Sequence, residues 1–350
     1  VRLWGDFPVI TTVADDITSE NIDEVYPQYF PKQNTELEAY QQIEKDLLDA
    51  VLYAPDNTPG NKTLFSKSVA RTLLAKIYAE KPLRDYTKVI QYCDEVKADG
   101  FDLVDDFSDL FGMNAAGTDA KMRNTKESIL EAQFTSGAGN WCTWMFGRDL
   151  VNWNNNFTWA KWVTPSRDLI SAFKQEGDEV RFKESIVYYD CNWSNYYPSD
   201  NYPFMYKCRS ANSSIIKYRY ADVLLLKAEA LIMQDTPDLE GAADIIDEVR
   251  DRAKLGALPT SVRSNKNVLL NALLKERRLE LAFEGQRWFD LVRLDKVEEV
   301  MNAVYAKDSG RKAQIYTFDK NSYRLPIPQS VIDANDKIHQ NPGYLSLIHI

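Results

Sequence analysis

The fold of this chain is set by residues 66–100, which read SKSVARTLLAKIYAEKPLRDYTKVIQYCDEVKADG. On each side of Pro82, apolar side chains recur at the i, i+3, i+4, i+7 spacing that gathers them on one face of a helix. Asp85 can cap the second helix, and Gly100 can end it. The segment therefore predicts two antiparallel helices. Their apolar faces are Ala70, Leu73, Leu74, Ile77 and Tyr78 in the first, and Tyr86, Val89, Ile90, Cys93 and Val96 in the second.

A second segment of the same kind occupies residues 219–253. It has the same length as the first, and that length is close to the period of about 34 residues of tetratricopeptide repeats, in which helix pairs stack on one another. We therefore predict a mainly α fold, built as an α-α superhelix of tetratricopeptide-like helix pairs. Ordinary helical hairpins of similar length are the alternative.

Between the two pairs, residues 101–215 lose helical periodicity, apart from a short helix predicted near Pro165–Lys174. We predict a long, loop-rich excursion there, and stretches of this length without regular structure are usually functional. The excursion is rich in aromatic residues, because 18 of the 42 in the chain lie within residues 134–206. Six of the eight tryptophans lie between Trp141 and Trp193, interleaved with Asn, Gly and Ser.

Aromatic rings beside asparagine amides suit a carbohydrate ligand. A sugar ring has an apolar face that packs on an aromatic ring, and its hydroxyls can bond to an amide that both donates and accepts. The alternative is that the rings anchor irregular loops to the core. We predict ligand-binding roles for Trp141, Trp144, Trp153, Asn154, Asn155, Trp159, Trp193, Tyr196 and Tyr197.

Composition argues against several other functions. The net charge of −10 makes nucleic acid or an anionic membrane surface an improbable partner. The only histidines are His339 and His349, and the four cysteines have no Cys-x-x-Cys spacing, so we predict no metal, no cofactor and no catalytic histidine. A glycosidase needs two facing carboxylates, and no acidic pair in the aromatic excursion stands out. We therefore expect a protein that is not an enzyme.

Residues 275–291, KERRLELAFEGQRWFDL, resemble the signature of the SusD/RagB-like family of outer-membrane nutrient-binding lipoproteins. Four other segments resemble the family in the same order along the chain. They are residues 4–9 (WGDFPV), residues 164–169 (TPSRDL), residues 219–230 (RYADVLLLKAEA) and residues 341–344 (NPGY). Within the signature, Glu276, Glu280 and Glu284 recur every four residues beside Arg277, Arg278 and Arg287, which predicts an ion-pair network that locks helices together.

The resemblance implies a function. It implies cell-surface binding of an oligosaccharide or polysaccharide, without catalysis, and delivery to a TonB-dependent transporter of the SusC type in the outer membrane. The alternative is a helical-repeat scaffold that binds only protein or peptide ligands. Contact with the membrane would come only through a lipid anchor in an N-terminal part missing from this sequence.

We expect one SusD/RagB-like domain over residues 1–344. The chain starts at Val1, amid apolar residues that read like the interior of a domain, so we expect it to be truncated at its N-terminus. Residues 345–350 are apolar and follow a natural stop, and we expect them to be a non-native tail.

Overall fold

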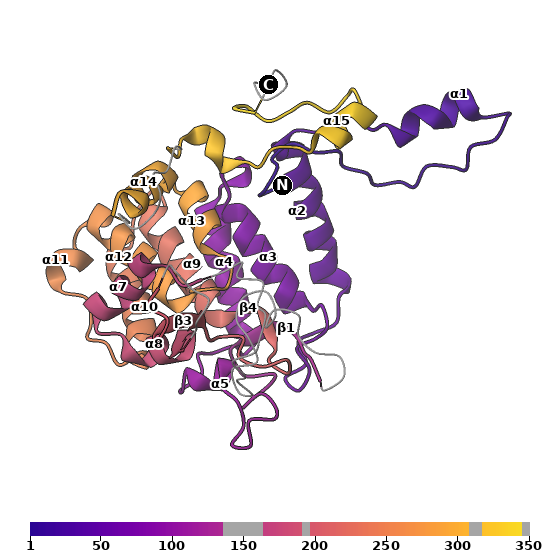
Figure 1. Cartoon of the computed structure of the whole chain (residues 1–350). Coiled ribbons are helices and arrows are strands. Elements are labelled where there is room, and N and C mark those ends of the chain that lie inside the picture. The colour runs from indigo at the N-terminus through magenta and orange to yellow at the C-terminus, as the bar shows by residue number, and fades with distance from the viewer. Residues whose placement is uncertain (136–163, 191–196, 308–316, 345–350) are drawn as a thin grey trace. The chain divides into compact units, whose positions relative to one another are not determined.

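The computed structural model of the chain describes residues 1–135, 164–190, 197–307 and 317–344 (Figure 1). The chain folds into two compact units. The first comprises Val1–Leu48, Glu80–Arg84 and Trp288–Ile350, and the second comprises Asp49–Ala79 and Asp85–Arg287. One domain over residues 1–344 stays a prediction, and the predicted tail lies outside the described residues.

The second unit contains most of the regular structure, and its described part is mainly helical, as predicted. Helix α2 (Glu36–Tyr53) runs into it from the first unit. Its helices are α3 (Lys67–Ala79), α4 (Tyr86–Ala98), α5 (Ser108–Phe111), α7 (Arg167–Glu176), α8 (Glu179–Ser185), α9 (Tyr220–Met233), α10 (Leu239–Arg252), α11 (Thr260–Arg263) and α12 (Lys266–Glu280), and its strands are β1 (Ser128–Ala132), β2 (Ile186–Tyr189), β3 (Tyr202–Met205) and β4 (Ile215–Arg219).

Both segments that predicted helix pairs form them, as α3–α4 and α9–α10. The side chain of Asp85 accepts a hydrogen bond from the backbone N–H of Lys88 and so caps α4, as its sequence position predicts. Helix α9 is the centre of the unit, since it packs against α3, α4, α10 and α12. The residues of α9 itself are apolar and buried on nearly all sides of the helix, which is the pattern of a helix in the protein core.

The excursion between the pairs contains two small antiparallel sheets in its described part. Strand β1 pairs with β4, and β2 pairs with β3, where Ile186 lies opposite Met205 and Tyr189 opposite Tyr202. Helix α7 covers nearly the predicted span, and it is capped by Ser166, whose side chain accepts a hydrogen bond from the N–H of Leu169. The short elements α5, α8 and β1–β4 were not predicted, because four to seven residues are too few to show a period.

The first unit has a small core of its own. Leu291, Val292 and Val297 are buried there beneath partly buried aromatic residues, including Trp288 and Phe318. Besides the start of α2, its elements are α1 (Ile22–Val25), the 3₁₀ turns Tyr26–Tyr29, Lys81–Leu83 and Lys320–Tyr323, and the helices α13 (Arg287–Arg293), α14 (Val297–Lys307) and α15 (Gln329–Ala334).

The Asn-Pro-Gly-Tyr segment ties the end of the chain to its start within the first unit. Asn341 is buried, and its Nδ2 donates to the carbonyl of Trp4 at 3.0 Å and to that of Leu325 at 2.8 Å. The Leu325 N–H also donates to the carbonyl of Leu3 at 2.7 Å. The segment is therefore structural, because one buried side-chain amide bonds to two backbone carbonyls from opposite ends of the chain.

No helix in the described part of the chain is long and apolar enough to cross a membrane. Cys93 and Cys208 are buried, and the other two cysteines lie outside the described residues.

Replacing Asn341 with alanine tests the role of this tie. We expect Asn341→Ala to lower the free energy of unfolding by about 1–3 kcal/mol, because two carbonyls lose their donor. The control is Gln329→Ala, which removes an exposed hydrogen bond to Asp333 and should change stability by less than about 0.5 kcal/mol. Urea unfolding followed by circular dichroism measures both, and equal stability of the two variants would contradict a structural role for Asn341.

Candidate functional site

Most of the predicted ligand-binding residues lie outside the described part of the chain. Trp141, Trp144, Trp153, Asn154, Asn155 and Trp159 belong to residues 136–163, and Trp193 and Tyr196 belong to residues 191–196. Tyr197 is described. Their roles stay predictions, and the described residues define where these two segments join the fold.

Residues 136–163 join the second unit at two points held by side chains. Before the segment, Nη2 of Arg123 donates to the carbonyls of Phe134 at 2.7 Å and Asn212 at 2.9 Å. After it, the hydroxyls of Thr164 and Tyr202 share a hydrogen bond of 2.7 Å. Both ends of the tryptophan-rich segment are therefore fixed, one by a guanidinium and the other by a strand of the β2–β3 sheet.

The strands β2 and β3 and their flanking tyrosines form a surface that we call the aromatic hairpin. Tyr202 and Phe204 are its buried centre, with ring centroids 5.0 Å apart. Around them pack partly buried side chains, which are Val187, Tyr189, Tyr197 and Tyr206. Residues 191–196 connect the two strands in sequence, so Trp193 and Tyr196 belong to this hairpin's connection.

Tyr197 is positioned by three neighbours. Its hydroxyl donates to the carbonyl of Pro165 at 2.7 Å, and its ring meets that of Tyr202 edge to face at 5.7 Å. The guanidinium of Arg167 lies 5.1 Å from the ring centroid, within reach of a cation–π interaction. These contacts give Tyr197 an anchoring role, and its predicted contact with a ligand stays a prediction.

The hydroxyls of Tyr188 and Tyr189 stay protonated at neutral pH. Burial raises the pKa of Tyr188, and burial together with the nearby Tyr206 raises that of Tyr189. A neutral phenol can both donate and accept a hydrogen bond. The half-buried rings of this surface therefore combine apolar area with neutral polar groups, which suits a hydroxyl-rich ligand.

Two cations hold the end of β3 in place. Arg209 lies over the ring of Tyr206 at 3.7 Å and donates to Oε2 of Glu184 at 2.8 Å. Lys207 is buried, and its Nζ donates to Oε1 of Glu284 at 2.6 Å and to the carbonyl of Glu280 at 2.8 Å. Burial lowers the pKa of Lys207 to about 8, although Glu284 opposes the shift.

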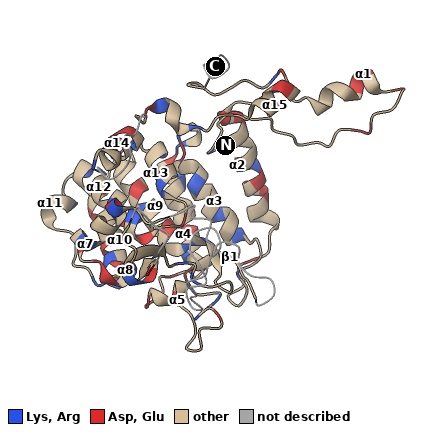
Figure 2. Ribbon diagram, viewed as in Figure 1, with Lys and Arg blue, Asp and Glu red and all other residues tan. Residues whose placement is uncertain are grey.

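Lys207 belongs to a larger group that we call the buried ion cluster, within the second unit. Figure 2 shows acidic and basic residues gathered around α8 and α10. The cluster consists of Glu127, Asp178, Glu276, Glu280 and Glu284 with Arg181, Lys207, Arg219 and Arg252.

Glu280 is the centre of this cluster. Its fully buried carboxylate is paired with Arg181 of α8, Arg219 at the junction of β4 and α9, and Arg252 at the end of α10. Burial alone would raise its pKa, but the three guanidiniums outweigh burial and hold the pKa well below its usual range. Glu280 is therefore ionised at any physiological pH and joins four elements.

The network was predicted, but its partners were not. Nη2 of Arg277 bonds to Oδ1 of Asp222 at 2.7 Å, Arg278 bonds to Asp168, and Arg287 donates to the carbonyl of Leu274. The row of Glu276, Glu280 and Glu284 is not helical throughout, since α12 ends at Glu280. Phe283 has a left-handed φ of 67°, which a helix cannot accommodate.

Asp222 forms a second buried ion pair on α9. It accepts from Nζ of Lys76 at 2.5 Å on one oxygen and from Arg277 on the other. Burial would raise the pKa of Asp222, but the two cations outweigh burial and hold it well below its usual range. The pair fastens α3 and α12 to the central helix.

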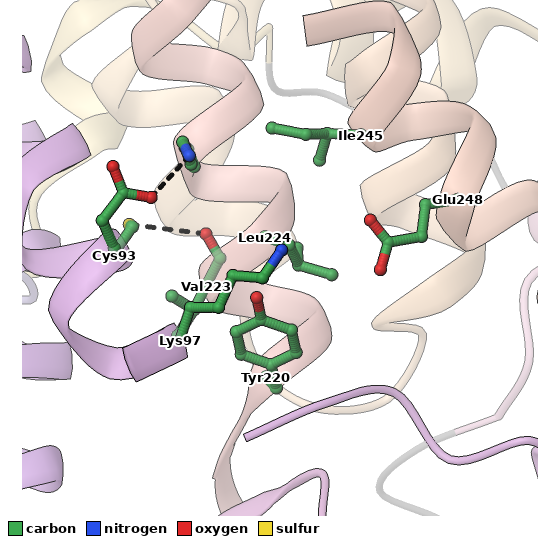
Figure 3. A pocket seen from close by; sticks show the side chains of 9 residues that line it. Cys93, Lys97, Tyr220, Val223, Leu224, Ile245 and Glu248 are labelled. Carbon is green, nitrogen blue, oxygen red and sulfur yellow. Dashed lines mark hydrogen bonds and ion pairs between the residues drawn. The ribbon is translucent and has the colours of Figure 1, made fainter. Parts of the chain in front are cut away.

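A small pocket lies among α4, α9 and α10, lined by Cys93, Lys97, Tyr220 and Glu248 among others (Figure 3). Its volume of about 40 Å³ accommodates a few water molecules. Sites for small organic ligands usually measure about 300–1,000 Å³, so this pocket is too small for a sugar ring. The described residues also contain no group of three or more His, Cys, Asp or Glu arranged to hold a metal ion.

Helix pairs around a central buried helix, with an aromatic hairpin beside them, define the architecture of the second unit. A sequence model of the SusD family matches residues 200–344. SusD-like protein P2 of Formosa agariphila is 28% identical over 393 residues, covering 98% of this chain and 71% of that protein.

Solved structures share the fold over nearly the whole chain. A laminarin-binding SusD-like protein is 24% identical with a TM-score of 0.70, covering 98% of this chain and 75% of that one. Surface glycan-binding protein A of Bacteroides uniformis is 19% identical with a TM-score of 0.71, covering 97% and 74%. Residues 200–344 therefore match the SusD family and the whole chain is similar to SusD-like proteins, which confirms the resemblance and the predicted mainly α fold.

Replacing Glu280 with glutamine tests the central role of its charge. We expect Glu280→Gln to lower the free energy of unfolding by about 3–5 kcal/mol, because three buried guanidiniums lose a shared counter-charge. The control is Glu240→Gln, which removes a mostly exposed partner of Arg263 and should cost at most about 1 kcal/mol. Comparable losses in urea unfolding of the two variants would contradict the central role of Glu280.

The Asp222 pair predicts a pH dependence. Because its folded pKa is lowered, the unfolded chain takes up a proton below about pH 4 that the folded chain does not, so this group's stabilisation falls as the pH falls. We expect wild type to exceed Asp222→Asn in unfolding free energy at pH 5, with the difference shrinking towards pH 2. Urea titrations at several pH values measure the difference, and a constant value across this range would refute the assignment.

Proposed function

We propose that this chain binds an oligosaccharide or polysaccharide at the cell surface and delivers it to a SusC-type TonB-dependent transporter in the outer membrane. The observation that carries the proposal is its SusD-like fold, shared with a laminarin-binding protein and a surface glycan-binding protein. The family match over residues 200–344 supports the same assignment. The ligand surface is the aromatic hairpin together with the tryptophan-rich residues 136–163 and 191–196.

Aromatic stacking and hydrogen bonding would supply the affinity. A ring contact contributes on the order of 1 kcal/mol beyond area burial, so several tryptophans must act together for useful binding. Neutral hydroxyls such as that of Tyr189 add hydrogen-bonding groups at the edge of the surface. Because each contact is weak, we expect modest affinity per protein, increased where a polysaccharide engages several sites at once.

We propose that binding occurs without bond cleavage. Hydrolysis of a glycosidic bond requires a carboxylic acid and a carboxylate about 5–10 Å apart across the substrate. Four of the carboxylates described near the aromatic hairpin are already bound by cations, which disfavours such a role for these four. Asp168 pairs with Arg278, Glu176 with Arg250 and Lys275, Asp178 with Arg181, and Glu184 with Arg209.

Removing single tryptophans tests the proposed site. We expect Trp153→Ala and Trp193→Ala each to weaken glycan binding about fivefold, the equivalent of one stacking contact of about 1 kcal/mol. Affinity gel electrophoresis measures retention in gels that contain laminarin, starch or plant polysaccharides. The matched control is Trp4→Ala, since Trp4 is partly exposed in the first unit and should leave retention unchanged.

The same panel separates the alternatives. If wild type is retained in the gel and neither substitution reduces that retention, Trp153 and Trp193 are not part of the glycan-binding site. Absence of retention on every glycan, together with binding to a peptide library, would favour the helical-repeat scaffold for protein or peptide ligands. Release of shorter sugars during incubation would contradict the non-catalytic assignment.

A further inference from the structure

The segment Ile10–Tyr29 of the first unit, here called the acidic arm, is a long connection whose two ends are held together at its base. At its base, the backbones of Phe7 and Asn34 exchange two hydrogen bonds of 3.2 and 3.1 Å. Nδ2 of Asn335 donates to the carbonyl of Pro31 at 2.8 Å and fastens the same base to the C-terminal segment. Figure 1 shows the arm, which contains α1, reaching out beside α15.

Most apolar side chains of the acidic arm are at least partly exposed. Of its 20 residues, 17 are exposed, and Val25 is the one that is buried. The exposed fraction is 96% for Val13 and 68% for Ile10, and Ile17 and Ile22 are also exposed. Exposed apolar side chains clustered on one short segment usually mark a surface that a partner covers.

The arm nevertheless has a defined shape. The hydroxyl of Tyr29 donates to the carbonyl of Asp15 at 3.0 Å and links the two limbs. The side chain of Asn21 accepts from the N–H of Thr18 and donates to the carbonyl of Asp16. A segment held in this way loses less entropy when it binds than a free chain would.

The charge of the arm is of one sign. It contains five acidic residues, which are Asp15, Asp16, Glu20, Asp23 and Glu24, and it contains no Lys, Arg or His (Figure 2). An anionic lipid surface would repel it, and so would the same arm of a second copy. The complementary occupant is a protein groove with an apolar floor and a rim of Lys and Arg.

We propose that the acidic arm is the docking element of this chain for its SusC-type transporter partner, inserting its isoleucines into an apolar groove with a basic rim. The inference rests on the proposed function, because that function supplies the partner. The carboxylates steer the encounter, and the apolar side chains keep the complex together once it forms.

Binding kinetics to a SusC-type transporter from the same organism, purified in detergent, test the inference. Neutralising the arm (Asp15→Asn, Asp16→Asn, Glu20→Gln, Asp23→Asn and Glu24→Gln) should lower the association rate constant about tenfold and flatten its salt dependence. Replacing its apolar side chains (Ile10→Ser, Ile17→Ser and Ile22→Ser) should instead raise the dissociation rate constant about tenfold.

The matched control neutralises five exposed acids outside the arm, Asp46→Asn, Asp49→Asn, Asp105→Asn, Asp235→Asn and Asp251→Asn, and should bind like wild type. Equal kinetics for wild type, the control and both arm variants would overturn the inference and leave the proposed partnership intact. A slower association for the control equal to that of the arm variant would also overturn it, because net charge alone would then explain the effect. Absence of binding by wild type would overturn both the partnership and the inference.

Discussion

The buried carboxylate of Glu280 is the constraint on which the second unit depends. An isolated charge in a protein interior is strongly unfavourable, so this carboxylate is tolerated only while cations surround it. Its three guanidiniums come from α8, the β4–α9 junction and the end of α10. The same helix end offers its last carbonyl to Lys207, which follows β3. The geometry that satisfies one charge therefore also fixes the scaffold beneath the aromatic hairpin.

The helix pairs could be predicted from the sequence because their determinants are local. Apolar spacing within residues 66–100 and 219–253, with a cap such as Asp85, is enough to specify a helical hairpin. The partners of the carboxylates could not be predicted in the same way. Arg181 and Glu276 are 95 residues apart, and only the folded chain brings them together. Arg277, although next to Glu276 in the sequence, forms its ion pair with Asp222.

In the candidate site, too, the residue composition could be read from the sequence, whereas the contacts that hold the site in place could not. Clustered tryptophans and asparagines mark residues 134–206 in the sequence, because aromatic enrichment is visible in a count of residues. The side chains that hold this region in place, Arg123 and Thr164, gave no such signal. Nothing in the sequence distinguishes Thr164 from any other threonine. Its role is seen only in the folded chain, where its hydroxyl forms a hydrogen bond with that of Tyr202.

The fixed ends of residues 136–163 have an evolutionary consequence. When both ends of a segment are held by side chains of the scaffold, the length of chain between them can change at little cost, roughly 0.6 kcal/mol for each doubling. The scaffold and the tryptophan-rich segment can then change at different rates in evolution. Exchanging this segment between relatives would alter the proposed ligand surface and leave the helical scaffold unchanged.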